Sequence, residues 1–279
     1  MAKGAGGMDE IERGAAAVRK HFAGTFPDTA LILGSGLGPF AEKLENATDI
    51  SYADIPGFPV PTVAGHAGRL RVGTVAGTPV ACLQGRFHAY EGHPAATLAL
   101  PVRILKALGV ERLILTNAAG GLRPDMPAGT LMIVEDHINF SGQNPLIGIN
   151  DDRIGPRFFD MTHAYDSDLR ADLKAAAGQC GVPVKSGVYV YCLGPNFETP
   201  AEVRMMAGFG AHAVGMSTVP ECLAAVHCGL KVAALSLITN LAAGLADGPL
   251  THAETLAEAA KAYAQVELLL LTFFKKMAP

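Results

Sequence analysis

Residues 30–38 read Ala-Leu-Ile-Leu-Gly-Ser-Gly-Leu-Gly, an apolar run followed directly by a glycine-rich loop. This order is typical of a buried strand of an α/β sheet that leads into a turn and a helix. The loop departs from the dinucleotide-binding pattern G-x-G-x-x-G/A because its sixth position is Pro39. Its backbone N–H groups and the hydroxyl of Ser35 are still suited to an anion. We therefore expect this loop to bind free phosphate rather than a dinucleotide.

Apolar runs and helical patterns alternate along the rest of the chain, which predicts an α/β protein with a largely parallel sheet covered by helices. The expected strands span 30–33, 69–75, 79–84, 112–116, 130–135, 186–193, 212–216 and 231–238. The expected helices span 9–22, 94–108, 168–180, 200–209, 219–229 and 251–275. Thr251 is the expected N-cap of the last helix, with Glu254 completing a capping box. Residues 140–165, rich in Gly, Asn, Pro and Asp, are predicted to form a long functional loop.

Composition narrows the classes of protein to be considered. No shift in composition marks a domain boundary in the 279 residues, so we expect one domain over 9–279, with 1–8 a disordered tail or an expression remnant. A net charge of −4 with 17% charged residues argues against a nucleic-acid partner. Polar residues interrupt the apolar stretch 223–246, and no signal peptide is recognisable, so we expect a cytoplasmic protein without a membrane span.

The cysteines give no sign of a disulfide framework or of a metal site. They are five in number, scattered and without a C-x-x-C pair, which predicts free thiols. His227 and Cys228 are adjacent, and neighbouring residues of a helix point about 100° apart, so they are poorly placed to share one ion. We expect no metal.

Polar side chains follow the predicted strands, at the edge where parallel sheets bind ligands. They are Ser35, Arg86, His88, Tyr90, Asn117, Phe197, Glu198, Ser217, Thr239 and Asn240, with the small pair Ala118-Ala119 after Asn117. A guanidinium, an imidazole and two hydroxyls among them suit a compact anion such as phosphate. Phe197 can stack on a flat ring while Glu198 and Asn240 pair with its polar edge. The set predicts a pocket for phosphate and a nucleobase.

Each of these residues also has a purely structural interpretation. Ser35 is a suitable helix cap, and Glu198-Thr199-Pro200 is ordinary chemistry for a helix start. Arg86 and His88 fit a surface pair, and Asn240 fits a turn. His66 is as well explained as a loop hydrogen-bonder, Tyr90 as a loop anchor and Met216 as core filler. Only their shared position at strand ends favours a site.

Several short segments, in the same order along the chain, resemble the trimeric purine nucleoside phosphorylases. They are GSGLG at 34–38, GHAG at 65–68, GRFHAYEG at 85–92, TNAAGG at 116–121, GPNFET at 194–199, AVGMSTVPE at 213–221 and SLITN at 236–240. The resemblance runs from about residue 10 to the last helix and is weakest over 241–250, where the chain is more similar to the bacterial members. It implies the nucleoside phosphorylase fold, a single α/β domain with a mixed, largely parallel, partly barrel-like sheet flanked by helices.

The resemblance also implies roles for individual positions. The phosphate pocket corresponds to Ser35, Arg86, His88, Ala118 and Ser217. The base pocket corresponds to Phe197, Glu198, Val214, Gly215 and Asn240. The ribose contacts correspond to Tyr90, Met216 and His252. Phe158 corresponds to an aromatic residue that reaches into a neighbouring subunit's site, which implies a functional homotrimer.

The activity implied is reversible phosphorolysis of 6-oxopurine ribonucleosides and deoxyribonucleosides, such as inosine and guanosine, in purine salvage. Phosphate is then a co-substrate and the nucleophile, so the carboxylate pair of a glycosidase is not needed, and neither is a cofactor. Asn240, His88 and Glu198 are the expected catalytic residues. A xanthosine phosphorylase and a non-catalytic nucleoside-binding protein remain as alternatives. So does a methylthioadenosine phosphorylase, although that sister group carries Thr at the position of Ser217 and Asp at that of Asn240.

Overall fold

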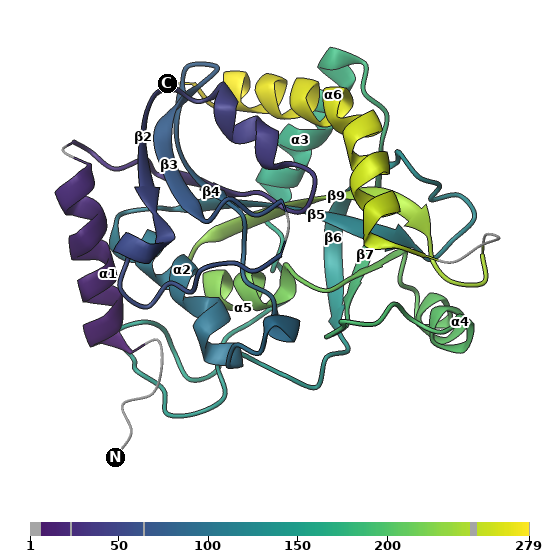
Figure 1. The fold of residues 1–279 in the computed structure, drawn as a ribbon, viewed down its shortest axis with the longest axis horizontal. Helices are drawn as coiled ribbons and strands as arrows, with labels where there is room; N and C mark the ends of the chain where they lie inside the picture. The colour runs from purple at the N-terminus through teal and green to yellow at the C-terminus, as the bar shows by residue number, and fades with distance from the viewer. Residues whose placement is uncertain (1–6, 23, 64, 246–249, 279) are drawn as a thin grey trace.

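A mixed sheet runs through the centre of the molecule (Figure 1). The computed structural model describes residues 7–22, 24–63, 65–245 and 250–278. The strands are β1 (Thr29–Ile32), β2 (Glu45–Ser51), β3 (Arg69–Val75), β4 (Thr78–Gln84), β5 (Arg112–Gly121), β6 (Leu131–Asn139), β7 (Val184–Tyr191), β8 (Ala213–Gly215) and β9 (Lys231–Leu241). Their order is β2-β3-β4-β1-β5-β8-β7-β6-β9, and β5 also pairs with β9, which closes β5, β8, β7, β6 and β9 into a barrel. The expected mixed, partly barrel-like sheet is confirmed.

The central strands β1, β5 and β9 are buried on both faces, which explains their nearly unbroken apolar sequence. Along β5, Leu113 and Leu115 belong to one hydrophobic cluster, whereas Ile114 between them belongs to another on the opposite face. Strands β1 and β5, and β5 and β9, pair in parallel. The carboxyl ends of these three strands therefore meet at one edge, where ligand-binding side chains are expected.

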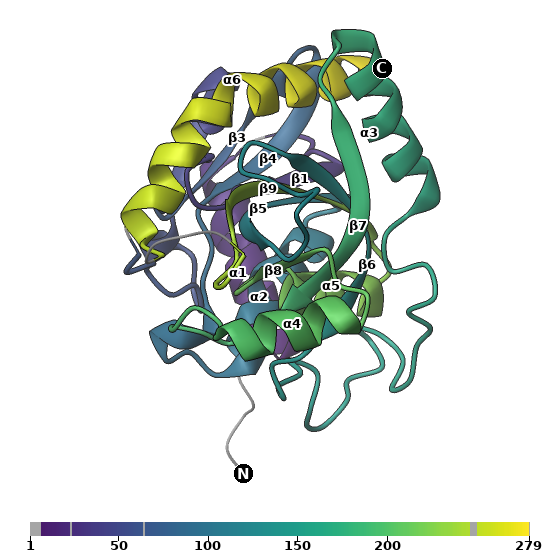
Figure 2. The same ribbon diagram turned by 90° about the vertical axis from the view of Figure 1, so that its right-hand side faces the viewer.

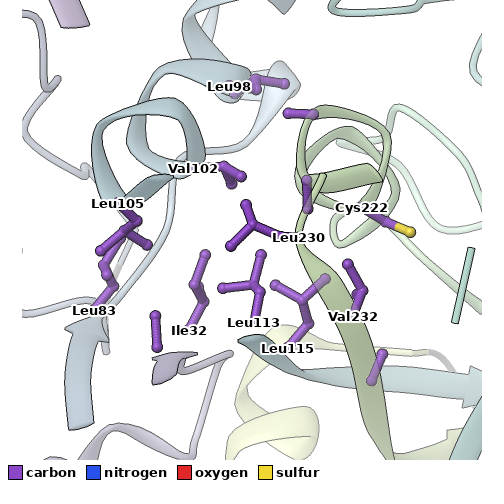
Figure 3. Close-up of a cluster of buried hydrophobic side chains, with 14 of the residues drawn as sticks. Ile32, Leu83, Leu98, Val102, Leu105, Leu113, Leu115, Cys222, Leu230 and Val232 are labelled. Atoms are coloured by element: carbon purple, nitrogen blue, oxygen red, sulfur yellow. The ribbon is translucent and has the colours of Figure 1, made fainter. Parts of the chain in front are cut away.

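Helices cover both faces of the sheet (Figures 1 and 2). They are α1 (Met8–His21), α2 (Ala95–Ala107), α3 (Ser167–Cys180), α4 (Pro200–Gly208), α5 (Val219–His227) and α6 (His252–Met277). Helices α1, α2 and α5 pack on one face, and α3 and α6 on the other. Figure 3 shows the first of these layers, where Val102 and Leu105 of α2 point toward Leu113 and Leu115 of β5.

Every predicted strand and helix is present, but three strands, β5, β6 and β9, continue at least three residues past their predicted ends. β5 continues to Gly121 and β9 to Leu241, so Ala118 and Asn240 lie within strands rather than after them. The capping box of Thr251 and Glu254 is confirmed at the start of α6, and residues 140–165 contain no helix or strand. Of the expected N-terminal tail, 1–6 lie outside the described residues, whereas Gly7 and Met8 already form the cap and first residue of α1.

Two local expectations were wrong or incomplete. Strand β2 was not predicted, because it lies at the sheet edge with most of its side chains exposed and has no apolar run. The loop 34–38 does not open an α-helix; it leads into a short 3₁₀ helix, Gly38–Lys43, with Pro39 in its first turn. A helix macrodipole therefore contributes little to anion binding there, and side chains must carry it.

Candidate active site

A cavity of about 290 Å³ lies at the carboxyl ends of the central strands. It is lined by Ser35, Val63, Arg86, His88, Tyr90, Asn117, Ala118, Ala119, Gly120, Pro195, Phe197, Glu198, Val214, Gly215, Met216, Ser217, Thr239, Asn240, Ala242, His252 and Thr255. The structure thus brings together all residues expected in the phosphate and base pockets, and Tyr90, Met216 and His252 of the ribose set. Phe158 lies outside the cavity and is 87% exposed.

The loop that carries Ser35 is held between β5 and α6 by its glycines. Gly34 N donates to Thr116 Oγ1 at 3.1 Å, and a Cβ on Gly34 would lie 2.6 Å from the Cα of Asn117. Gly36 has a φ of +77°, and a Cβ there would lie 2.4 Å from the Cβ of Ala259. Any side chain at either position would push the loop away from the sheet. The glycines therefore set the position of Ser35.

His66 links Ser35 to Arg86 from behind the cavity. Its Nδ1 accepts a hydrogen bond from Arg86 N at 3.1 Å, and its Nε2 lies 3.3 Å from Ser35 Oγ. Burial, together with the neighbouring His88 and Arg86, lowers the pKa of His66 to about 3, so the ring is neutral at pH 7. Because Nδ1 is an acceptor, the ring proton is on Nε2 and is donated to Ser35. The Ser35 hydroxyl is then free to donate its own proton into the cavity.

Arg86 is 3% exposed, and two protein acceptors hold its guanidinium in place. Its Nε donates to Glu221 Oε1 at 2.8 Å, and its Nη1 donates to the carbonyl of Thr116 at 2.5 Å. The interpretation of Arg86 and His88 as a surface pair is wrong, because His88 is only 5% exposed. A guanidinium held in this way presents a fixed positive charge at one end of the cavity.

His88 is oriented by its neighbours in the same turn. The backbone N–H of His88 donates to Glu91 Oε1 at 2.8 Å, and the ring Nδ1 lies 3.2 Å from the same oxygen. The ring of Tyr90 stacks on that of His88, with centroids 4.6 Å apart. Burial lowers the pKa of His88 despite the hydrogen bond that its ring donates to the Glu91 carboxylate. The ring is therefore predominantly neutral at pH 7, with Nδ1–H directed at Glu91 and Nε2 as its second nitrogen.

A strained turn at Thr218 follows Ser217, and the buried side chain of Asn117 holds this turn in place. Thr218 has a φ of +73°, which is rare for a β-branched residue, and Val219 N donates across it to Ser217 O at 2.8 Å. Asn117 Nδ2 donates to Thr218 Oγ1 at 2.9 Å. Backbone strain of this kind is found at ligand clamps, where the surrounding structure compensates for it.

The other end of the cavity is less constrained. Phe197 is 38% exposed. Glu198 is buried and has no positively charged partner among the residues that the structure describes, so desolvation raises the pKa of its carboxyl group. The segment Glu198-Thr199-Pro200 is a helix start, as its structural interpretation predicts: Thr199 caps α4 through a capping box with Glu202, and Pro200 is the first helical residue. Glu198 precedes the cap and also lines the cavity. Asn240 is in β9 rather than in a turn, and its Nδ2 donates to Leu241 O at 3.1 Å. Likewise Ser35 is not a cap, because Leu37 is the N-cap of the 3₁₀ helix.

Several lining residues were not predicted as site residues. Asn117, Ala119 and Thr239 were noticed at strand ends but given no role, whereas Val63, Gly120, Pro195, Ala242 and Thr255 were missed. Thr255 was within reach of sequence reasoning, since it lies three residues after His252 on the same face of α6. Val63 belongs to an irregular loop and gives no such signal.

Other chemical features of the described residues are simple. They contain no group of three or more His, Cys, Asp or Glu side chains placed to hold a metal ion. All five cysteines are free thiols, as predicted. None of the described helices is both long and apolar enough to cross a membrane.

Comparison with known proteins identifies the family. The phosphorylase superfamily model matches residues 28–275. The chain is 51% identical to purine nucleoside phosphorylase 1 of Bacillus subtilis over 89% of this chain and 91% of that protein, and 49% identical to the Bos taurus purine nucleoside phosphorylase over 86% and 85%. The Schistosoma mansoni purine nucleoside phosphorylase in complex with inosine superposes with a TM-score of 0.92 at 38% identity, over 98% of both chains. A schistosoma purine nucleoside phosphorylase with hypoxanthine gives a TM-score of 0.93 at 38% identity, over 99% of this chain and 100% of that one. With its barrel-containing sheet and its cavity of strand-end residues, this chain belongs to the purine nucleoside phosphorylases of the phosphorylase superfamily.

Proposed function

We propose that the cavity binds phosphate between Ser35, Arg86, His88, Ala118 and Ser217, and a 6-oxopurine between Phe197, Glu198, Val214, Gly215 and Asn240. The ribose then lies between these ends, near Tyr90, Met216 and His252. The observation that carries this assignment is the division of one cavity into a buried end with a guanidinium and hydroxyl donors, and a more open end with an aromatic ring, a carboxyl and an amide. An anion suits the first end and a polar heteroaromatic ring suits the second.

The reaction needs no nucleophile from the protein. Phosphate bound at the first end attacks the anomeric carbon as the glycosidic bond to the purine breaks, and its negative charge stabilises the developing oxocarbenium ion. The products are the free base and ribose or deoxyribose 1-phosphate. Because phosphate performs this step, the reaction needs neither a cofactor nor a metal.

Asn240 is the group that we assign to the leaving purine. Its amide can donate to the 6-oxygen while its carbonyl accepts from N7 as that atom gains a proton. Both contacts strengthen only as the bond breaks, which is the requirement for catalysis rather than for binding alone. Glu198, when ionised, accepts from N1–H and holds the ring. An aspartate at position 240 would lack the donor for a 6-oxygen, so the asparagine favours inosine and guanosine over adenosine.

The functional unit that we propose is a homotrimer in the cytoplasm. Four large apolar side chains of the loop 140–165 are exposed, Phe140, Ile147, Ile149 and Phe158, which suits an interface between copies. Phe158 would then complete the ribose pocket of a neighbour. Sedimentation should give about three times the chain mass of 29.0 kDa, and Phe158→Ala should raise the KM for inosine. The five free thiols agree with a reducing compartment.

The decisive experiment follows base release from purified protein. Hypoxanthine should form from inosine only when phosphate is added, together with ribose 1-phosphate. Release without phosphate would identify a nucleosidase, and binding without release would identify a sensor. Adenosine and methylthioadenosine should be poorer substrates than inosine under the same conditions; faster cleavage of either would overturn the proposed base specificity.

A further inference from the structure

A buried ion pair links the cavity to the first turn of α5. Arg86 Nε and Glu221 Oε1 are 2.8 Å apart, and their side chains are only 2% and 7% exposed. Arg86 follows β4, whereas Glu221 is the third residue of α5, so the pair joins segments 135 residues apart in the chain. Glu221 is not among the residues that line the cavity. Its carboxylate therefore has no direct contact with the cavity, and Arg86 is the lining residue that it holds.

The hydrogen bonds of the guanidinium leave one nitrogen without a partner. Glu221 accepts from Nε and the Thr116 carbonyl accepts from Nη1, but Nη2 is buried and has no hydrogen-bond partner in the parts of the chain that the structure describes. An unsatisfied buried donor is costly, and a charged one more so. Arg86 lines the cavity beside Ser35, His88 and Ser217. The unpartnered Nη2 of Arg86 is thus accounted for if an anion occupies that end of the cavity.

We propose that Glu221 is a positioning residue for phosphate: it fixes the rotation of the Arg86 guanidinium so that Nη2 faces the bound anion. The inference rests on the proposed assignment of Arg86 to phosphate. A freely rotating arginine offers several donors in many orientations, whereas two fixed contacts leave one orientation only. The guanidinium is then already oriented in the folded protein, so phosphate binding does not have to restrict its rotation.

A positioning role and a pure charge effect of Glu221 predict opposite changes in phosphate binding. The negative charge of Glu221 by itself opposes phosphate binding, so a pure charge effect predicts tighter phosphate binding when the charge is removed. A positioning role predicts weaker binding whenever the acceptor oxygen is lost or displaced. Glu221→Gln removes the charge but keeps an acceptor oxygen at the same distance along the side chain. Glu221→Asp keeps the charge but withdraws the oxygen by one methylene, and Glu221→Ala removes both.

The test measures the KM for phosphate at saturating inosine and the KM for inosine at saturating phosphate, with thermal unfolding of each variant. We expect Glu221→Asp and Glu221→Ala to raise the KM for phosphate about 10-fold or more, on the scale of a lost charged hydrogen bond, with the KM for inosine within about twofold. Glu221→Gln should stay within about threefold of the wild type. The exposed Glu111→Gln is the matched control and should change neither constant. If Glu221→Ala fails to fold, the comparison of Glu221→Asp with Glu221→Gln still tests the positioning role.

Three results would overturn the inference: an unchanged KM for phosphate in Glu221→Asp, an equal rise in the KM for inosine, or a Gln variant as impaired as the Asp variant. Arg86→Ala separates this failure from failure of the phosphate site itself. If Arg86→Ala raises the KM for phosphate but Glu221→Asp does not, only the positioning role is wrong. If Arg86→Ala also leaves it unchanged, the proposed phosphate site is wrong.

Discussion

The two ends of the cavity differ in how firmly other protein groups hold their side chains. At the phosphate end, Arg86 and His88 are 3% and 5% exposed, and each is held by a carboxylate of its own, Glu221 and Glu91. At the base end, Phe197 is 38% exposed. Within the described part of the chain, Glu198 has no positive partner, and the side chain of Asn240 bonds only its immediate chain neighbours.

This difference reflects what each ligand can supply. Phosphate is small and charged, and it must be oriented as a nucleophile, so donors fixed before binding are an advantage. A purine offers a large apolar face and its own polar edge, so stacking and a few hydrogen bonds suffice, and the open end permits exchange. Substitutions at the phosphate end should therefore act on phosphate alone, whereas substitutions at the base end should act on catalysis and on substrate choice.

Asn240→Asp should produce the largest effect. It removes the donor to the 6-oxygen that strengthens as the base leaves, which is comparable with the loss of one transition-state donor and should lower kcat/KM for inosine by about 10²–10³-fold. The ratio of adenosine to inosine cleavage should rise, while the KM for phosphate stays within about threefold. Unchanged inosine turnover would remove Asn240 from the mechanism and break the distinction between the two ends.

Ser35→Ala should give the next largest effect, and at the opposite end. The hydroxyl that His66 orients would be lost, raising the KM for phosphate by about 10-fold, the scale of one hydrogen bond to a charged ligand. The KM for inosine should remain near the wild-type value at saturating phosphate. Steady-state kinetics with each substrate varied in turn would show this; a matching rise in both constants would mean that Ser35 serves the whole cavity.

The pH dependence should distinguish the base end from the phosphate end. Desolvation raises the pKa of Glu198, so the carboxyl group becomes protonated at a higher pH than an ordinary glutamate and then no longer accepts from N1–H. kcat/KM for inosine should fall about tenfold per unit once the pH drops below that raised pKa. Glu198→Gln should have lower activity but lack this acidic limb. An acidic limb that persists in the Gln variant would assign it to another group.

His66→Asn should give the smallest change. The asparagine carbonyl can still accept from Arg86 N, but the contact to Ser35 Oγ is lost, so the KM for phosphate should rise only about threefold, the scale of a neutral hydrogen bond. The low pKa of His66, about 3, also predicts that no titration of this ring appears in the phosphate KM between pH 5 and 8. A proton NMR titration of the wild-type histidines would check this point.

Sequence reasoning was sufficient for the elements that are buried on both faces. Strands such as β5 and β9 have apolar runs that predict them directly, and their parallel pairing places Ala118 and Asn240 at one edge of the sheet. The edge strand β2 could not be predicted in this way, because its exposed side chains leave no hydrophobic period. The extent of the strands was also underestimated, since pairing with a neighbour, rather than local composition, decides where a strand ends.

The candidate phosphate and base residues could be predicted because the end of a strand can be recognised in the sequence, and the ends of parallel strands meet at one edge of the sheet. The residues that orient them could not. Glu221 lies 135 positions from Arg86, and nothing in the segment that contains it indicates a partner on another element. Likewise, a histidine in a glycine-rich loop gives no sign that it links Ser35 to the Arg86 backbone.

The sequence by itself therefore determined the α/β class, the order of its elements and the chemical types gathered at the sheet edge, because hydrophobic periodicity and residue chemistry are local properties. Only the tertiary structure decided that β5 and β9 close a barrel, that His66 is neutral and that Nη2 of Arg86 has no partner among the described residues. These depend on burial and on contacts between segments distant in the chain. Such contacts fix protonation and orientation, and local sequence does not specify them.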